Sequence, residues 1–247
     1  MRSLWMASFV FFLLFPVFYW AQDAKAPSPD GAQRMRKAAS STLAPVYEPL
    51  AEWLVDKFDL IEKEGIGVDV GGGPGTLIIE LAKRTKMHWI NADINPNHFP
   101  FFFAAADKAG LGGRVSALFA DVQHLPLRDD YADFAISRGS FPFWENKQAG
   151  FAEILRVLKP GCAAYIGRGF SENLPVETAK QVRDKQNQNG KGLKYDLNET
   201  ESELRGIMKT LGIENFIIHR PKPSGSEGVN YGIWVEFRKS SANNPEK

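Results

Sequence analysis

The most constraining feature of this sequence is an apolar, β-branched run that ends in a glycine-rich turn, residues 66–76 (I-G-V-D-V-G-G-G-P-G-T). A helical pattern follows at once, with apolar residues at 77, 78, 81 and 82 and charged residues at 80, 83 and 84. We therefore predict a strand, a tight turn and a helix in succession. Such a turn lets a ligand approach the backbone, and the helix directs N–H groups and its positive dipole end toward that ligand.

The spacing of the glycines narrows the choice of ligand. A dinucleotide-binding turn needs G-x-G-x-x-G, but here the third place falls on Thr76 or Ile78, depending on which glycines are counted. A phosphate-binding P-loop needs a lysine, and the turn has none. The turn instead places an acid two residues before three alternating glycines, at Asp69, Gly71, Gly73 and Gly75.

Two further acids follow predicted strands. Residues 87–93 read as a second strand ending in Asp93, and an acid at that point can accept both ribose hydroxyls of a nucleoside. The alternative is that Asp93 caps the following helix. Residues 114–120 read as a third strand, and Asp121 comes directly after it. A lone acid after a strand would mean little, but the position of Asp121, one strand beyond Asp93, makes it a candidate binding residue as well.

These motifs resemble class I S-adenosylmethionine-dependent methyltransferases, most closely the small-molecule ubiquinone/menaquinone-biosynthesis type. The D-x-G-x-G-x-G turn resembles motif I of that family, and residues 120–134 (A-D-V-Q-H-L-P-L-R-D-D-Y-A-D-F) resemble its segment after the third strand. Residues 153–161 (E-I-L-R-V-L-K-P-G) resemble its turn before the fifth strand. The resemblance covers about residues 41–238 and is most specific from 66 to 166.

The resemblance implies a fold and a reaction. The expected fold is a doubly wound α/β domain with a seven-stranded, mostly parallel sheet whose last strand is antiparallel. The expected cofactor is S-adenosylmethionine, whose sulfonium methyl group passes to a small-molecule acceptor. In-line methyl transfer needs mainly proximity and alignment, so the lack of an evident base does not argue against an enzyme.

The resemblance also implies roles for individual residues. The glycine turn would lie under the methionine and ribose portions of the cofactor, and Asp69 would help to hold its ammonium side. Asp93 would accept the ribose hydroxyls, Asp121 would bind the adenine amino group, and the Val122 N–H would bind a ring nitrogen. The predicted cofactor-binding residues are Asp69, Gly71, Gly73, Gly75, Asp93, Asp121, Val122 and Ser137.

The segment after the fourth strand, residues 137–145 (S-R-G-S-F-P-F-W-E), is the candidate acceptor site. It resembles the family's S-R-x-S-x-x-H-W, but Phe143 stands where histidine is common, so no histidine base is expected there and no catalytic residue is assigned. Aromatic rings can bury a flat acceptor, and an arginine can pair with an anionic group on the acceptor or with the cofactor carboxylate. The candidate substrate-binding residues are Arg138, Phe141, Trp144 and Glu145. The alternative is that Phe141 and Trp144 pack the next helix against the sheet.

The rest of the domain continues the α/β pattern. Pro160-Gly161 is expected to end a helix before a strand at 162–166, and Asn198 to start a capping box of the last helix. The polar segment 186–192 is either a lid or an ordinary loop. The remaining expected elements are helices at 41–65, 99–110, 147–158, 177–186 and 198–211, and strands at 134–137, 213–220 and 229–237.

The N-terminus has a different composition. Residues 4–21 are apolar apart from Ser8, which is short for a membrane span and long for a signal-peptide core, so a cleaved signal peptide and a membrane anchor both stay open. The basic residues at 25, 34, 36 and 37 weakly favour a domain on the cytoplasmic face. The predicted organisation is a leader at 1–21, an irregular linker at 22–40, a methyltransferase domain at 41–239 and a disordered tail at 240–247.

Composition restricts the function further. A net charge of +1 gives no case for a nucleic-acid partner. A single cysteine, Cys162, allows neither an intrachain disulfide nor a cysteine-based zinc site, and the histidines lack metal-ligand spacing, so no metal is expected. Two alternatives remain: a nicotinamide-dependent oxidoreductase, and an inactive membrane-tethered domain that binds the cofactor or acts as a scaffold. Neither the acceptor nor the oligomeric state is predicted.

Overall fold

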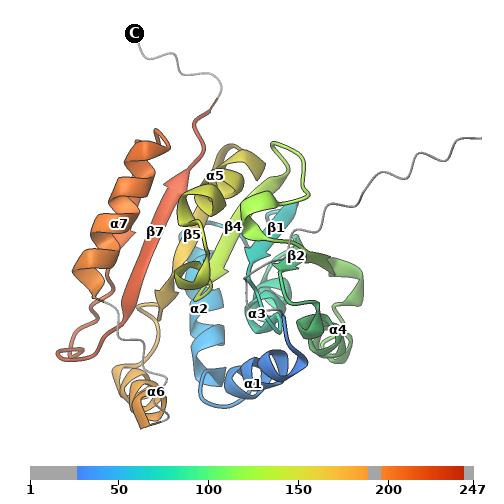
Figure 1. Ribbon diagram of the computed structural model, residues 1–247. Coiled ribbons are helices and arrows are strands. Elements are labelled where there is room, and N and C mark those ends of the chain that lie inside the picture. Colours follow the sequence, from blue (N-terminus) through green and yellow to red (C-terminus); the bar gives the residue numbers. More distant parts are fainter. Residues whose placement is uncertain (1–26, 189–195, 242–247) are drawn as a thin grey trace, which may run out of the picture.

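The computed structural model describes residues 27–188 and 196–241, which form a seven-stranded sheet with helices on both faces (Figure 1). The order across the sheet is β3-β2-β1-β4-β5-β7-β6, and β7 runs antiparallel to β5 and β6 while the neighbouring pairs from β3 to β5 are parallel. The mixed, mostly parallel sheet expected from the sequence is confirmed. Its strands are Ile66–Val70 (β1), His88–Asp93 (β2), Val115–Phe119 (β3), Ala132–Arg138 (β4), Leu158–Gly169 (β5), Phe216–His219 (β6) and Gly232–Arg238 (β7).

Alternation along the strands divides the core into two layers. Phe134 and Ile136 of β4 pack under α2 (Ala44–Lys57), α3 (Thr76–Arg84) and α4 (Phe99–Lys108). Ala135 faces the other layer, under α5 (Lys147–Val157) and α7 (Leu197–Thr210). Successive strand residues point to opposite faces, so a strand that is apolar on both faces is covered on both sides.

Residues 29–39, expected to be an irregular linker, form a helix, α1 (Pro29–Ala39). Ser28 caps it by accepting a hydrogen bond from the Gly31 N–H, proline occupies its first turn, and Arg36 and Lys37 lie in its last turn. These residues are local signals for the start and the end of a helix. A prediction based on composition alone does not take them into account. The linker prediction is therefore wrong for these residues, and the helix expected from residue 41 begins at Ala44 as α2.

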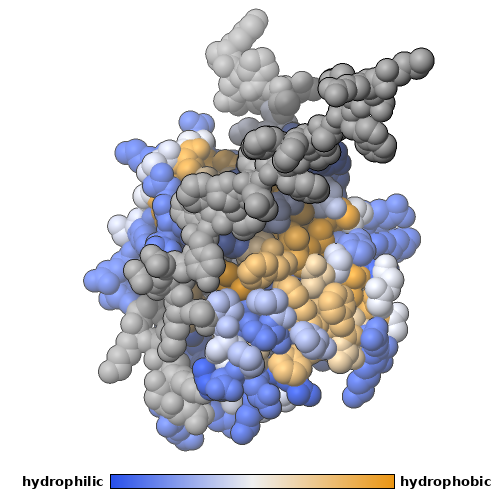
Figure 2. Space-filling view, turned by 45° about the vertical axis from the view of Figure 1, so that its right-hand side comes forward, coloured by the Kyte–Doolittle hydropathy of each residue, from blue (hydrophilic) through white to orange (hydrophobic). Residues whose placement is uncertain are grey.

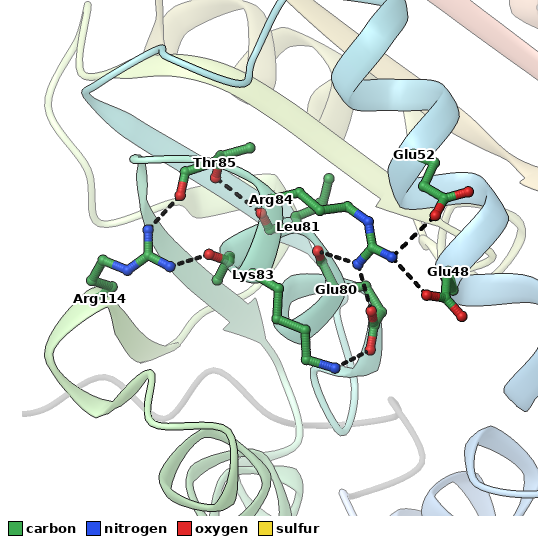
Figure 3. Close-up of polar contacts among 9 residues, drawn as sticks. Glu48, Glu52, Glu80, Leu81, Lys83, Arg84, Thr85 and Arg114 are labelled. Atoms are coloured by element: carbon green, nitrogen blue, oxygen red, sulfur yellow. Dashed lines mark hydrogen bonds and ion pairs between the residues drawn. The ribbon is translucent and has the colours of Figure 1, made fainter.

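Two arginines tie α3, the helix that follows the glycine turn, to neighbouring elements (Figure 3). The Arg84 guanidinium of α3 bonds Glu80 on its own helix at 2.7 Å and Glu48 on α2 at 2.8 Å. Arg114, from the short 3-10 helix η2 (Gly112–Arg114), donates to the carbonyl oxygens of Ala82 and Thr85 at the end of α3. The helix that follows the glycine turn is thus held at its C-terminal end from two sides.

Two local expectations differ from the structure. The cap of α7 is Asp196, whose carboxylate accepts the N–H groups of Asn198 and Glu199, so Asn198 is the second residue of the helix and not its cap. Pro160-Gly161 does not separate a helix from a later strand, because β5 already begins at Leu158. The register against β4 shifts between Leu158 and Ala163, so the two residues sit in a bulge inside the strand.

Among the described residues, no helix has both the length and the apolar character needed to cross a bilayer. The predicted leader at 1–21, much of the segment 186–192 and most of the predicted tail lie outside the described residues. Figure 2 shows an apolar area on the side of the molecule that carries α4. Two large apolar side chains are exposed among the described residues of α4 and the edge strand β3: Phe103, by 42%, and Phe119, by 62%.

Candidate functional site

The carboxyl ends of the parallel strands surround a cavity of about 410 Å³. The chain winds outward from β1 to β3 on one side and from β4 to β5 on the other, so β1 and β4 meet at the point where the strand order reverses. Open α/β sheets bind ligands at such a point. The loop after each of β1, β2, β3 and β4 contributes to the cavity wall, with Gly71, Ile94, Asp121 and Ser140.

The glycine turn is shaped by positions that other residues cannot occupy. Gly71, Gly73 and Gly75 have φ values of +70°, +56° and +72°, in the left-handed region that favours glycine. A Cβ atom on Gly71 would lie 2.4 Å from the Ser140 side chain, and one on Gly72 would lie 2.5 Å from the Asn91 Oδ1. Glycine thus allows the turn to pack closely against Ser140 and Asn91, and Gly71, Gly72 and Gly73 line the cavity.

Asp93 at the end of β2 anchors this turn. One carboxylate oxygen accepts the Gly73 N–H at 2.8 Å, and the other accepts the Asn95 N–H at 2.7 Å. Asn91 adds a second link, since its side-chain amide donates to the Gly73 carbonyl at 2.9 Å. Asp93 also lines the cavity, so it both holds the turn and presents a carboxylate to a ligand.

Asp69 at the end of β1 is a buried carboxyl at the floor of the cavity, 2% exposed. Burial, reinforced by the nearby Asp93 charge and opposed by Arg138, raises its pKa to about 8. Its Oδ1 has no hydrogen-bond partner within the described part of the chain. A buried carboxyl oxygen without a partner is costly, and a cationic ligand group would offset that cost.

The other predicted cofactor residues divide into two groups. Asp121 and Val122 line the cavity, and Asp121 caps the 3-10 helix η3 (Val122–His124) by accepting the Gln123 N–H at 2.9 Å. Gly75 and Ser137 do not line it: Gly75 begins α3 against the Phe102 ring, and the fully buried Ser137 hydroxyl bonds the Ser140 hydroxyl at 2.6 Å.

The candidate acceptor residues also separate. Arg138, Trp144 and Glu145 line the cavity, whereas Phe141 is buried among the core residues under α5. Trp144 both faces the cavity and packs against the next helix, so it fits each of the two roles considered from the sequence. It lines the cavity, its ring lies 5.4 Å from that of Phe151 on α5, and its indole N–H donates to the Ser140 hydroxyl at 3.1 Å.

The wall also includes residues that the sequence does not single out, among them Met35, Tyr47, His98, Ser140, Arg168 and Arg183, and it includes Phe143 of the candidate acceptor segment. Met35 comes from α1, Tyr47 from α2 and Arg183 from α6 (Val176–Gln188). Of these residues, Arg168 could have been predicted from the sequence. It lies near the end of β5, and therefore at the same edge of the sheet as Arg138. Burial lowers the pKa of His98 although Asp93 opposes this, so its ring favours the neutral state.

Three arginines on the wall are each faced by an aromatic ring. The guanidinium carbon lies 5.0 Å from the Tyr47 ring centre for Arg138, 5.9 Å from that of Phe143 for Arg168 and 4.2 Å from that of Phe170 for Arg183. Such stacking orients a guanidinium while its N–H groups point outward in the plane. Among the described residues, no cluster of histidine, cysteine and acidic side chains suits a metal ion.

Comparison with known proteins adds independent findings. Residues 68–166 match the family model of a methyltransferase domain. A 2-methyl-6-phytyl-1,4-hydroquinone methyltransferase of Oryza sativa is 31% identical over 122 residues, which is 49% of this chain and 34% of that protein. The ubiquinone/menaquinone biosynthesis C-methyltransferase of Vibrio vulnificus is 31% identical over 96 residues, 38% of this chain and 37% of that protein. These matches span about a third of the length of either relative.

A solved structure shares almost the whole domain. A candidate S-adenosyl-L-methionine-dependent methyltransferase from Methanococcus maripaludis superposes with a TM-score of 0.74 at 27% identity, covering 90% of this chain and 98% of that one. The similarity in structure therefore extends well beyond residues 68–166.

Proposed function

We propose that the chain is a class I S-adenosylmethionine-dependent methyltransferase, which transfers the methyl group of S-adenosylmethionine to a small-molecule acceptor. The observation that carries the proposal is the set of acidic side chains Asp69, Asp93 and Asp121 around one cavity. They lie at or just beyond the carboxyl ends of β1, β2 and β3, and Gly71, Gly72 and Gly73 of the glycine turn line the same cavity.

The residues present fit this cofactor. Asp69 has a buried oxygen without a partner in the described part of the chain, which suits an ammonium group. Asp93 suits ribose hydroxyls, and the cavity of about 410 Å³ is of the size that small-molecule sites have, from roughly 300 to 1,000 Å³. Gly71, Gly72 and Gly73 line the cavity, so the glycine turn offers backbone groups to a ligand.

The protein's part in the reaction is to bind and to align. S-adenosylmethionine supplies an electrophilic sulfonium methyl group when it is bound. Asp69, Asp93 and Asp121 would fix the orientation of the cofactor, while Phe143 and Trp144 would hold the acceptor and exclude water from the cavity. No described side chain needs to form a covalent intermediate.

The relatives support a small-molecule acceptor. The Oryza enzyme is a hydroquinone methyltransferase and the Vibrio enzyme is a ubiquinone/menaquinone biosynthesis C-methyltransferase, so acceptors of low molecular mass occur among the similar proteins. The atom that this chain methylates, whether carbon, nitrogen, oxygen or sulfur, is left open by the proposal.

A thermal-shift titration tests the cofactor. S-adenosylhomocysteine should raise the melting temperature in proportion to the logarithm of its concentration above the dissociation constant, whereas NADH should not. A shift with NADH alone would favour the oxidoreductase alternative. Transfer of label from methyl-labelled S-adenosylmethionine to extracted small molecules then separates an active enzyme from an inactive binding domain.

We further propose that the chain associates with a membrane through residues 4–21, with the domain on the cytoplasmic face. The apolar run and the basic residues Lys25, Arg34, Arg36 and Lys37 support this. Fractionation of the full chain against a chain starting at residue 27 tests the association, and protease protection tests the side. Full-length protein that stays wholly in the soluble fraction would contradict it.

A further inference from the structure

The charged side chains around the cavity are separated by sign. Asp69 and Asp93 lie at the ends of β1 and β2 and Asp121 lies just beyond β3, whereas Arg138, Arg168 and Arg183 come from β4, β5 and α6. Glu145, an exposed residue beyond η4 (Phe141–Phe143), is the one carboxylate among the described lining residues on the arginine side. A single cavity therefore has an acidic side and a basic side.

This separation suits two ligands of different charge. A cofactor with sulfonium and ammonium groups is attracted to the carboxylates, and its own carboxylate needs only one cation. Arg138 is placed for that role, because its charge acts directly on the Asp69 carboxyl, whose pKa it lowers against the larger effect of burial. Arg168 and Arg183 lie on elements that the cofactor motifs do not include.

The two remaining arginines are built into the protein. Arg183 donates from Nε to the Asn230 carbonyl at 2.7 Å and from Nη1 to the Gln186 side chain at 3.0 Å, and its guanidinium lies over Phe170. Arg168 lies over Phe143, which is 72% exposed at the edge of the cavity. Stacked guanidinium groups are suited to paired hydrogen bonds with carboxylate or phosphate oxygens.

We propose that the methyl acceptor carries a carboxylate or phosphate group, that Arg168 and Arg183 bind this group, and that its apolar body lies against Phe143 and Trp144. The inference rests on the proposed methyl transfer and names the acceptor class for that reaction. It differs from the acceptor site expected from the sequence, which included Arg138 and the segment after β4 alone.

The test uses simple probes and the full-length chain. Benzoate, phenyl phosphate and the uncharged benzyl alcohol are titrated by calorimetry, with and without saturating S-adenosylhomocysteine. At least one anionic probe should bind about tenfold or more tighter than benzyl alcohol, as expected for a charge-assisted pair of hydrogen bonds. A preference for benzoate identifies a carboxylate acceptor, and a preference for phenyl phosphate identifies a phosphate.

Variants locate the site. R168Q and R183Q should each weaken the anionic probe about tenfold while leaving benzyl alcohol and S-adenosylhomocysteine affinity within about twofold. R168K, which keeps the charge but loses the planar fork, should give an intermediate loss. The matched control is R128Q, because Arg128 also lies over an aromatic ring, that of Tyr131, but does not line the cavity.

The outcomes separate the two claims. Normal S-adenosylhomocysteine binding without preference for anionic probes, or with a preference that both glutamine variants keep, overturns the acceptor inference alone. No binding of S-adenosylhomocysteine to the unaltered chain contradicts the proposed function, and the titrations without it still test the arginine pair.

Discussion

At the residue scale, the protonation state of Asp69 should make the stability of the protein depend on pH. Its pKa of about 8, raised by burial and by Asp93, means that the carboxyl holds a proton at neutral pH in the unliganded protein. The unfolded chain releases that proton near pH 4, so between about pH 4 and pH 8 the folded state binds more protons. The contribution of Asp69 to stability is therefore greatest below about pH 4 and is lost as the pH rises toward 8.

Ligand binding should reverse this preference. An ammonium group beside Asp69 favours the ionised carboxylate, so we expect S-adenosylhomocysteine to bind more tightly as the pH rises from about 6 to 8, with release of a proton. Calorimetry in buffers of different ionisation enthalpy measures that proton. D69N should bind more weakly at the higher pH and lose the proton release, and an unchanged pH profile in D69N would remove Asp69 from the site.

Some residues of the site could be predicted from the sequence and others could not. Asp93 and Asp121 could be found because each follows a strand that its apolar pattern reveals. Tyr47 and Arg183 could not, because they reach the cavity from helices whose position over the sheet is set by packing. Ser137 and Phe141 follow from the resemblance but are buried. Strand alternation along β4 directs the Ser137 side chain inward, and Phe141 of η4 packs in the core under α5.

At the element scale, α1 extends the domain beyond the boundary expected at residue 41. It contacts the 3-10 helix η1 (Pro96–His98) through a hydrogen bond of 3.2 Å from the Asn95 side chain to the Ser28 carbonyl. Arg36 lies over the Phe101 ring, and Met35 lines the cavity. The helix therefore belongs to the wall of the site.

Removal of α1 tests this role. A chain starting at residue 41 should bind S-adenosylhomocysteine more weakly than one starting at residue 27, because it loses part of the cavity wall, while far-ultraviolet circular dichroism should still show the α/β domain. The substitution K63Q in the longer chain is a suitable control, since Lys63 bonds the Asp133 carbonyl away from the cavity. Equal affinity of the two chains for S-adenosylhomocysteine would show that residues 29–39 take no part in binding it.

Two neighbouring residues at the end of the short helix η4 differ in their surroundings. Phe143 is exposed, whereas Trp144 packs against Phe151 and Gly150. We expect F143A to leave the free energy of unfolding nearly unchanged, and W144A to lower it by about 3 kcal/mol, the low end for a large aromatic because Trp144 is only partly buried. Urea denaturation measures both, and a W144A variant as stable as F143A would show that Trp144 serves the cavity alone.

At the scale of the whole molecule, the strand order brings residues far apart in the chain to one edge. The glycine turn and the carboxylates lie on one side of the β1–β4 junction, and the arginines lie on the other. The pattern of strands and helices could be predicted because apolar periodicity and glycine turns are local. The two-sided charge of the cavity could not, because it depends on α6 and on the register of β5 against β4.

The most direct test of the central claim is a crystal structure of the protein with S-adenosylhomocysteine. We expect its adenine beside Asp121 and Val122, its ribose hydroxyls on Asp93 and its amino-acid portion between Asp69 and Arg138, with the arginine side of the cavity left open for an acceptor. Electron density for the ligand at any other place, or at this place for NADH but not for S-adenosylhomocysteine, would contradict the assignment.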